Sequence, residues 1–222
     1  MISVESLDVV PYPHPALRWK AKPVTSVTPL VQDVARRMIS LMHEYKGIGL
    51  AANQVAVPWR MFVSCALDGD MVFINPTITP VKGKRLFVAD IPEGCLSIQG
   101  LNIDFPIHRD LNIEVSALDI NGNPFTVPAA DLRKNNCLLA RCALHETDHL
   151  DGILFVDYVP TNSKDEEIQK LRKYVDGWLN YLKTQYEFLP SHGKLALGKY
   201  ESNDQEIQKL LALEGLMSSV AA

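Results

Sequence analysis

His145, Glu146 and His149 place two imidazole side chains four positions apart, with a carboxylate directly after the first. On an α-helix, residues i and i+4 share one face, so both rings can reach one metal ion. A carboxylate beside the first ligand can then act on a water molecule that the metal polarises. The spacing therefore predicts a helix over about residues 137–150 and a metal-assisted hydrolysis. The alternative is a polar helix face with two ordinary histidines.

The residues before this motif favour a buried helix whose last turns bind metal. Leu138, Cys142, His145 and His149 fall at i, i+4, i+7 and i+11, which is one helical stripe. The stripe is apolar at its N-terminal end and metal-ligating at its C-terminal end. Gly152 then supplies a helix stop. We expect the metal at the end of an apolar pocket.

The composition fits an ordinary soluble globular protein rather than one that binds nucleic acid by bulk charge or crosses a membrane. The 222 residues suffice for one substantial core, with 47% hydrophobic and 22% charged residues. The net charge of −4 argues against nucleic-acid binding by bulk charge, and no apolar run approaches the roughly 18 residues of a membrane span. The N-terminus does not resemble a secretory signal, and the four cysteines form no CxxC pair, so we expect a reducing cytoplasm. Cys65 and Cys137 are predicted to be core or surface thiols.

The order of the predicted elements indicates an α+β fold. Thr28 and Pro29 supply a helix start, and apolar residues keep helical spacing until Gly47. Strands are predicted at 61–63, 71–74, 85–88 and 112–118, followed by a tight turn at Asn121-Gly122 and, after the motif helix, by a long helix over 165–188. We expect mixed or antiparallel sheets packed around a central motif-bearing helix, with an N-terminal and a C-terminal helix. Residues 1–188 would form the catalytic domain, and 189–222 a partly helical tail.

A catalytic site of this kind usually has three protein ligands and one open position. Cys95 is the best candidate for the third, because Gly94 permits a close main-chain approach and Pro92 marks an irregular backbone. Cys142 is a competitor, but its place three residues before His145 suits a pocket wall better. A small buried thiol in a strand is the alternative interpretation of Cys95.

The segment 47–54, which reads GIGLAANQ, offers further functional groups. Two glycines flank Ile48 and permit an exposed, extended edge that can pair with a peptide backbone. The Gln54 amide can stabilise a developing oxyanion. Taken alone, the segment favours the plainer alternative of a helix cap, a turn and a strand, with Gln54 on the surface.

These segments, in this order and spacing, resemble the three signature motifs of the peptide deformylase family: GxGLAAxQ, EGCLS, and HExxH followed by DHLxG. The sequence has them at residues 47–54, 93–97 and 145–152, and the resemblance extends over roughly residues 8–185. It implies a bacterial cytoplasmic hydrolase that removes the N-formyl group from the first methionine of nascent polypeptides and releases formate. N-formylmethionyl nascent peptides are then its substrates.

The resemblance also implies a role for particular residues. One divalent metal ion, in this family usually Fe²⁺ with Zn²⁺, Ni²⁺ or Co²⁺ as alternatives, would be bound by Cys95, His145 and His149. Glu146 would transfer protons, while the Gln54 side chain and the Leu96 backbone N–H would hold the oxyanion. The substrate backbone would pair with Ile48, Gly49 and Gly94. The methionine pocket would be lined by Ile48, Ile91, Leu138 and Cys142.

The sequence departs from the family pattern at several positions. Leu144 stands where glutamine is usual, Gln99 where proline is common, and Asn102 and Ile107 where arginine is frequent. The loop over 129–136 also differs in composition. None of these changes affects a proposed ligand, so they bear on substrate affinity and on the residues around the ligands more than on the type of reaction.

Two other functions compete with this interpretation. A zinc endopeptidase would need a third ligand downstream of His149, for which Asp157 and His192 are the nearby options. A peptide-binding relative without turnover is the second alternative, against which the presence of Glu146 and Gln54 argues. The helix over 165–188 resembles one that some family members use to dock on the ribosome, although its charge is mixed.

Overall fold

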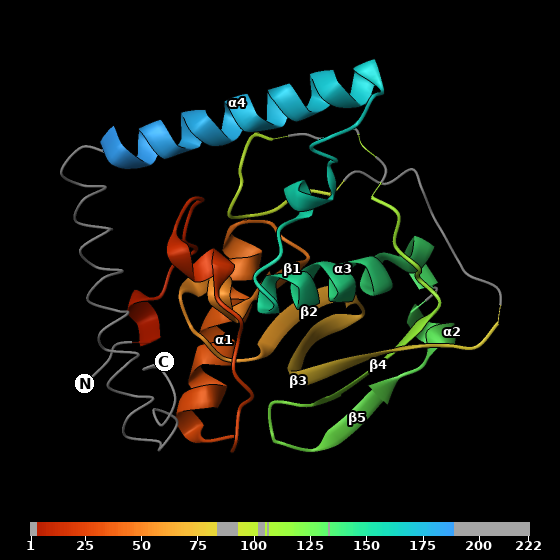
Figure 1. Cartoon of the computed structure of the whole chain (residues 1–222). Helices are drawn as coiled ribbons and strands as arrows, with labels where there is room; N and C mark the ends of the chain where they lie inside the picture. Colours follow the sequence, from red (N-terminus) through yellow and green to blue (C-terminus); the bar gives the residue numbers. More distant parts are fainter. Residues whose placement is uncertain (1–3, 84–92, 102–104, 106, 133, 189–222) are drawn as a thin grey trace, which may run out of the picture.

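The computed structural model describes residues 4–83, 93–101, 105, 107–132 and 134–188 (Figure 1). Within them the strands form one five-stranded antiparallel sheet in the order β1-β2-β3-β4-β5. Their bounds are β1 Gly49–Ala51, β2 Met61–Leu67, β3 Gly69–Pro80, β4 Ile113–Leu118 and β5 Pro124–Val127. The strand predicted at 85–88 lies outside the described residues. An antiparallel sheet with separate helices is an α+β arrangement.

The three long helices of the described residues confirm the predicted ones, with shifts at their ends, whereas the short helices were not predicted. Their bounds are η1 Val4–Ser6, η2 Pro15–Arg18, α1 Pro29–Glu44, η3 Ala52–Val55, α2 Ala129–Leu132, α3 Lys134–Leu150, η4 Phe155–Tyr158 and α4 Glu166–Phe188. Thr28 caps α1, because its hydroxyl oxygen accepts a hydrogen bond from the Val31 N–H at 3.4 Å. The helix that carries the motif begins at Lys134, earlier than predicted, and the short α2 precedes it. No described helix combines the length and the apolar character needed to cross a membrane.

Helices cover both faces of the sheet. Side chains alternate between the two faces of a strand, so neighbouring residues pack into different clusters. Leu50, Val63 and Val72 pack with α1. Ala51, Phe62 and Phe73 pack with α3, and the two phenylalanine rings stack with centroids 4.5 Å apart. The motif helix therefore lies directly on β1 and β2 (Figure 1).

A third apolar cluster anchors the segment that carries Cys95. It joins parts of the chain that are far apart in sequence: Val10 and Leu17 from the segment before α1, Ile98, Phe155 of η4, and Val175 of α4. In Figure 1, α4 lies across the end of the molecule, above the loops that lead to η4. Ile98 is 1% exposed, so the backbone just after Cys95 is fixed by packing.

Candidate metal centre and active-site pocket

The thiol of Cys95 and the imidazoles of His145 and His149 lie together at the C-terminal half of α3. One ligand atom from each residue falls within 4.8 Å of the others. The Cys95 Sγ is 3.3 Å from the His149 Nε2. His149 is 1% exposed, while Cys95 is half-buried, so the cluster is enclosed on the helix side and open on the Cys95 side. The sequence predicted this triad, and the structure brings all three residues together.

The donor set fits a divalent transition metal. A thiolate and two imidazole nitrogens suit Fe²⁺, Zn²⁺, Ni²⁺ or Co²⁺, whereas magnesium and calcium prefer oxygen. The carboxylate oxygen Oε2 of Glu146 is buried beside the three residues and has no hydrogen-bond partner among the described residues. A buried oxygen of this kind needs a partner such as water. The residues present therefore match a site that holds a cation and a water molecule.

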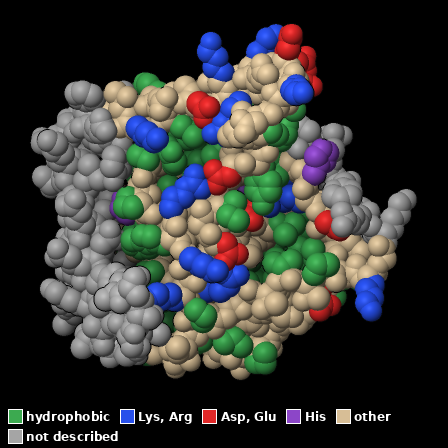
Figure 2. All heavy atoms as spheres, in the orientation of Figure 1, with side chains coloured by type: hydrophobic (Ala, Val, Ile, Leu, Met, Phe, Trp, Pro, Cys, Tyr) green, Lys and Arg blue, Asp and Glu red, His purple; other side chains and the backbone are tan. Residues whose placement is uncertain are grey.

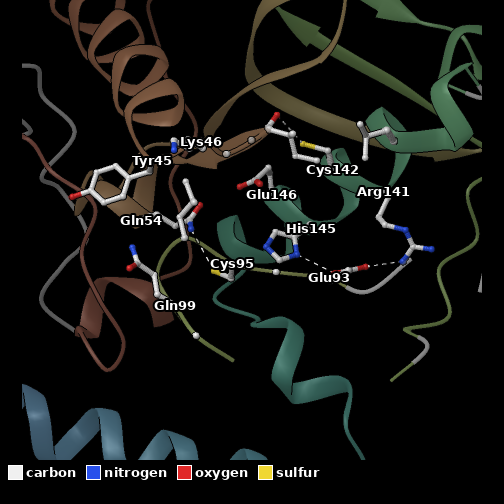
Figure 3. Close-up of a pocket in the computed structure, with 17 residues that line it drawn as sticks. Tyr45, Lys46, Gln54, Glu93, Cys95, Gln99, Arg141, Cys142, His145 and Glu146 are labelled. Carbon is white, nitrogen blue, oxygen red and sulfur yellow. Dashed lines mark hydrogen bonds and ion pairs between the residues drawn. The ribbon is translucent and has the colours of Figure 1, made fainter. Parts of the chain in front are cut away.

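Glu93 orients the first histidine. Its Oε2 lies 3.0 Å from the Nδ1 of His145. A carboxylate only accepts hydrogen bonds, so the Nδ1 carries the proton and the Nε2 keeps a lone pair for the metal. Figure 3 shows Glu93 on the far side of His145 from Glu146, with Arg141 beyond it. The sequence interpretation missed this role, although Glu93 stands two positions before Cys95 in the second motif.

Two arginines hold Glu93 in its charged form. Arg109 donates to both carboxylate oxygens, at 2.5 and 2.8 Å, and Arg141 donates at 3.0 Å. Burial alone would raise the pKa of Glu93, but hydrogen bonds from Arg109 and His145 outweigh it and lower the pKa to about 2. Arg109 also donates to Asp148 on α3 at 2.8 Å, so the network ties the second motif to the third.

The network clarifies the departures from the family pattern. Ile107 is buried in the third apolar cluster, and the arginine that pairs with both oxygens of Glu93 is Arg109, two residues further on. Leu144 packs against the apolar cluster that α3 forms with Phe62 and Phe73 of the sheet, rather than into the pocket. Gln99 lines the pocket, and Asn102 lies outside the described residues.

Glu93→Gln is expected to lower the free energy of unfolding of the metal-free protein by about 3–5 kcal/mol, because it removes the buried carboxylate that two buried guanidinium groups share. The affinity for metal should fall by about 10–100-fold as His145 loses its orientation. Denaturant unfolding and competition with a chelator measure the two effects. Glu166→Gln, on an exposed carboxylate, is the matched control. A stability loss below about 1 kcal/mol, the range of exposed pairs, would contradict this role for Glu93.

Gln54 is buried beside the sulfur ligand and is not a surface residue. Its Oε1 accepts from the Ala51 N–H at 2.9 Å, which fixes the direction of the amide. The Nε2 then donates toward the Cys95 Sγ at 3.5 Å and the Ser97 Oγ at 3.3 Å. The amide hydrogens therefore point to the side of the cluster where a substrate oxygen would lie (Figure 3).

Glu146 is the carboxyl group that faces the cluster from α3. It is 4% exposed, and burial raises its pKa to about 7. A carboxyl group with a pKa near neutrality can both accept and return a proton under physiological conditions. Glu93 and Glu146 thus differ in environment: arginines keep the first one charged, and an apolar setting lets the second exchange protons.

An open cavity of about 590 Å³ lies in front of the cluster. The described residues predicted to bind substrate all line it, namely Ile48, Gly49, Gly94, Leu138 and Cys142. Ile91 lies outside the described residues. The Cys142 thiol contacts the Ser64 Oγ at 3.3 Å, and burial raises its pKa well above the usual value. Cys142 therefore stays a neutral pocket wall, as the sequence predicted, and does not compete with Cys95.

Gly49 is required by close packing. A Cβ atom on this residue would lie 2.5 Å from the Cys142 Sγ and 2.6 Å from the Glu146 Oε1. Strand β1 can approach α3 so closely only without a side chain at this position. The same strand is an edge of the described sheet, and Ile48 just before it is 44% exposed. The predicted extended edge is therefore present at Ile48 and β1, whereas residues 52–54 of the same segment turn into η3 and are buried.

Gly49→Ala is expected to reduce the rate of turnover by about 100-fold while the protein keeps its metal. The added methyl group must displace Glu146 or push β1 outward, and a shift near 1 Å costs about this much. The rate of formate release and the metal content together test the prediction. Gly177→Ala is the control, since a Cβ there meets nothing within 4 Å. An unchanged rate of formate release in Gly49→Ala would contradict the prediction, because β1 would then shift outward without disturbing Glu146.

Among the described residues, no ligand downstream of His149 joins Cys95, His145 and His149, as an endopeptidase would need. Asp157 pairs with Arg18 at 2.5 Å and accepts from the Leu154 N–H, and His192 lies outside the described residues. A thiol and two helical imidazoles lie beside a buried carboxyl group in an open pocket, and this set fits a metal-assisted hydrolase whose third candidate ligand is the Cys95 thiol.

Comparison with known proteins gives the family. The profile of the family described as polypeptide deformylase matches residues 6–165. The peptide deformylase of Chromohalobacter salexigens is 38% identical over 170 residues, which cover 75% of this chain and 94% of that protein. The peptide deformylase of Rhodopirellula baltica is 34% identical over 195 residues, covering 86% and 87%. The crystal structure of peptide deformylase from Thermus thermophilus superimposes with a TM-score of 0.66 at 30% identity, covering 81% and 98%.

The chain belongs to the polypeptide deformylase family. It is a hydrolase that removes the formyl group from N-terminal formylmethionine, and enzymes of this family depend on a metal. The family match and the site agree, because the matched residues 6–165 include all three metal-ligating candidates and Glu146.

Proposed function

We propose that Cys95, His145 and His149 hold one divalent cation at the centre of the deformylase reaction. Support comes from the three ligand atoms within 4.8 Å of one another and from the donation of the His145 Nδ1–H to Glu93. When bound, the cation supplies Lewis-acid activation of a water molecule and of the formyl oxygen. We also propose α3 as the central element of the fold, because it carries two of the ligands.

Glu146 is the proton-transfer group. Its unpartnered Oε2 and its pKa of about 7 suit it to accept a proton from the attacking water. The same carboxyl group then delivers that proton to the nitrogen of the breaking amide bond. The products are formate and a peptide with a free methionyl amine.

Gln54 and the Leu96 backbone N–H stabilise the oxyanion that develops on the formyl group. The contact of Gln54 with Ala51 sets its amide hydrogens in advance, so little reorganisation is needed when charge develops. Leu96 directly follows Cys95 and lines the same cavity, which suits its N–H to the same task.

The substrate lies along the edge of β1. An extended peptide backbone pairs with Ile48, Gly49 and Gly94, as in strand addition to a sheet edge. The methionine side chain enters the cavity against Ile48, Leu138 and Cys142, with Ile91 as a further wall. The lack of a side chain at Gly49 and the apolar wall of α3 support this placement of the substrate.

Fe²⁺ is the proposed native metal, with Zn²⁺, Ni²⁺ and Co²⁺ as ions that the same ligands accept. A thiolate with two imidazoles binds each of them, so the ligand set alone leaves the choice to metal supply. Elemental analysis of protein purified without oxygen tests the assignment. One iron per chain is the expected result. A protein that contains zinc and no iron would contradict the assignment of Fe²⁺.

Formate release from N-formyl-Met-Ala, measured anaerobically with iron present, tests the function of this chain. The unformylated dipeptide Met-Ala is the control for release of other products. Turnover is expected with the fully metallated protein. A metallated protein that binds the substrate without releasing formate would instead be the peptide-binding relative considered above.

We further propose that residues 1–188 form the catalytic domain in a bacterial cytoplasm, with 189–222 as a tail outside the described residues. Docking of α4 on the ribosome is a weaker proposal. On the side that Figure 2 shows, Lys and Arg side chains lie beside Asp and Glu at the α4 end of the molecule, so the charge there is mixed. Tyr174 and Tyr181 are about half exposed and supply contact area. Unchanged cosedimentation with ribosomes after truncation at residue 163 would remove this proposal.

A further inference from the structure

A second group of metal-ligating side chains lies away from the Cys95 centre. It consists of His43 in the last turn of α1, Cys65 in β2 and Asp70 at the start of β3. One ligand atom of each falls within 4.8 Å of the others. The His43 Nε2 is 2.7 Å from the Asp70 Oδ1, so the side chains of α1 and β3 already point at each other.

The distance between His43 and Asp70 is close to the one that a tetrahedral cation needs, and the Cys65 Sγ lies within 4.8 Å of both ligand atoms. Zinc bonds of about 2.0–2.3 Å to nitrogen, oxygen and sulfur place the ligand atoms roughly 3.3–3.6 Å apart. The His43–Asp70 pair would open by less than 1 Å, and Cys65 would turn toward the gap. One nitrogen, one sulfur and one oxygen leave a fourth position for water, as in sites open to solvent.

The backbone holds the three residues on separate elements. The Cys65 N–H donates to the Ile48 carbonyl at 3.0 Å, which fixes the middle of β2 beside the segment before β1. The β2–β3 pairing is irregular between Ser64 and Leu67, and irregularities of this type re-aim a side chain out of the regular alternation. The side chains of His43 and Asp70 are 53% and 37% exposed, so a cation can enter from solvent.

We propose that His43, Cys65 and Asp70 form a second divalent-cation site, for a borderline ion such as Zn²⁺, distinct from the centre at Cys95. The sequence interpretation treated Cys65 as an ordinary core or surface thiol. The proposal does not rest on the deformylase reaction, since none of the three residues is among those assigned to it.

Zinc stoichiometry of the full chain tests the second site. After equilibrium dialysis against micromolar free Zn²⁺, the wild-type protein is expected to hold two ions per chain. Cys65→Ser and Asp70→Asn should hold one ion and still release formate from N-formyl-Met-Ala. Asp68→Asn removes an exposed carboxylate from the same hairpin and should keep both ions.

A thermal measurement gives an independent readout. Adding Zn²⁺ to the one-ion form should raise the Tm of the wild-type protein and of Asp68→Asn, but not of Cys65→Ser or Asp70→Asn. If Cys65→Ser fails to fold, His43→Asn, which changes an exposed side chain, takes its place. One ion per chain in the wild-type protein, or two ions retained in these variants, would overturn the proposal. Absence of formate release with two zinc ions bound would count against the deformylase assignment alone.

Discussion

Glu146→Gln is expected to keep the metal and lose about 10²–10⁴-fold in kcat. Glutamine has the size of glutamate, so it fills the buried space between Gly49 and Cys142 without a clash. It cannot accept the proton of the attacking water or return one to the leaving amine. The measurement is kcat for formate release, with metal content determined on the same sample.

Glu167→Gln, an exposed carboxylate in the first turn of α4, is the control for Glu146→Gln and should leave both quantities unchanged. A kcat reduced less than about 10-fold in fully metallated Glu146→Gln would assign the proton transfer to another group. Loss of metal in this variant would instead make Glu146 a ligand or a support for one.

Cys95→Ala is expected to reduce metal affinity by more than about 100-fold, the upper range for the loss of a group that only supports a ligand. The variant keeps the two imidazoles of α3 but loses the sulfur that lies 3.3 Å from the His149 Nε2. Formate release should fall in proportion to metal content. Titration of the metal-free protein with Co²⁺ or Zn²⁺ measures the affinity, and carrying it out in the Cys65→Ser background removes the contribution of the proposed second site.

Cys65→Ser is the matched control, because it removes a thiol outside the Cys95 centre and should leave that centre and formate release intact. The result also separates the two enzyme classes. An endopeptidase with ligands downstream of His149 would keep its metal and its activity in Cys95→Ala.

Local patterns made much of the fold predictable. The Thr28-Pro29 start of α1 has a local cause, a hydroxyl that caps the first turn, and the sequence alone reveals it. The i, i+4 spacing of His145 and His149 likewise requires only a helix to bring both rings to one side. Cys95 was predictable because its motif lies in a fixed order relative to the other two.

The residues that orient the ligands left no such local signal. Glu93 pairs with Arg109 and Arg141, which are 16 and 48 positions away, and ion pairs over such distances have no sequence period. The family pattern has arginine at position 107, where this chain has isoleucine, and gives no signal for Arg109. The network became visible only when the fold brought these segments together.

Short elements and close contacts were also beyond sequence reasoning. Strand β1 has three residues and α2 has four, so neither is long enough to display a hydrophobic period. Gln54 was assigned to the surface when its segment was considered alone, because its burial depends on the contact with Cys95 and Ser97. The steric need for glycine at 49 arises from α3, almost 100 positions later.

The most direct test is a crystal structure of the protein loaded with one equivalent of metal, with anomalous scattering measured at that metal's absorption edge. The coordination inferred for this deformylase predicts a single strong peak about 2.3 Å from the Cys95 Sγ and about 2.1 Å from the Nε2 atoms of His145 and His149. A peak elsewhere, or a Cys95 side chain turned away from both rings, would contradict it.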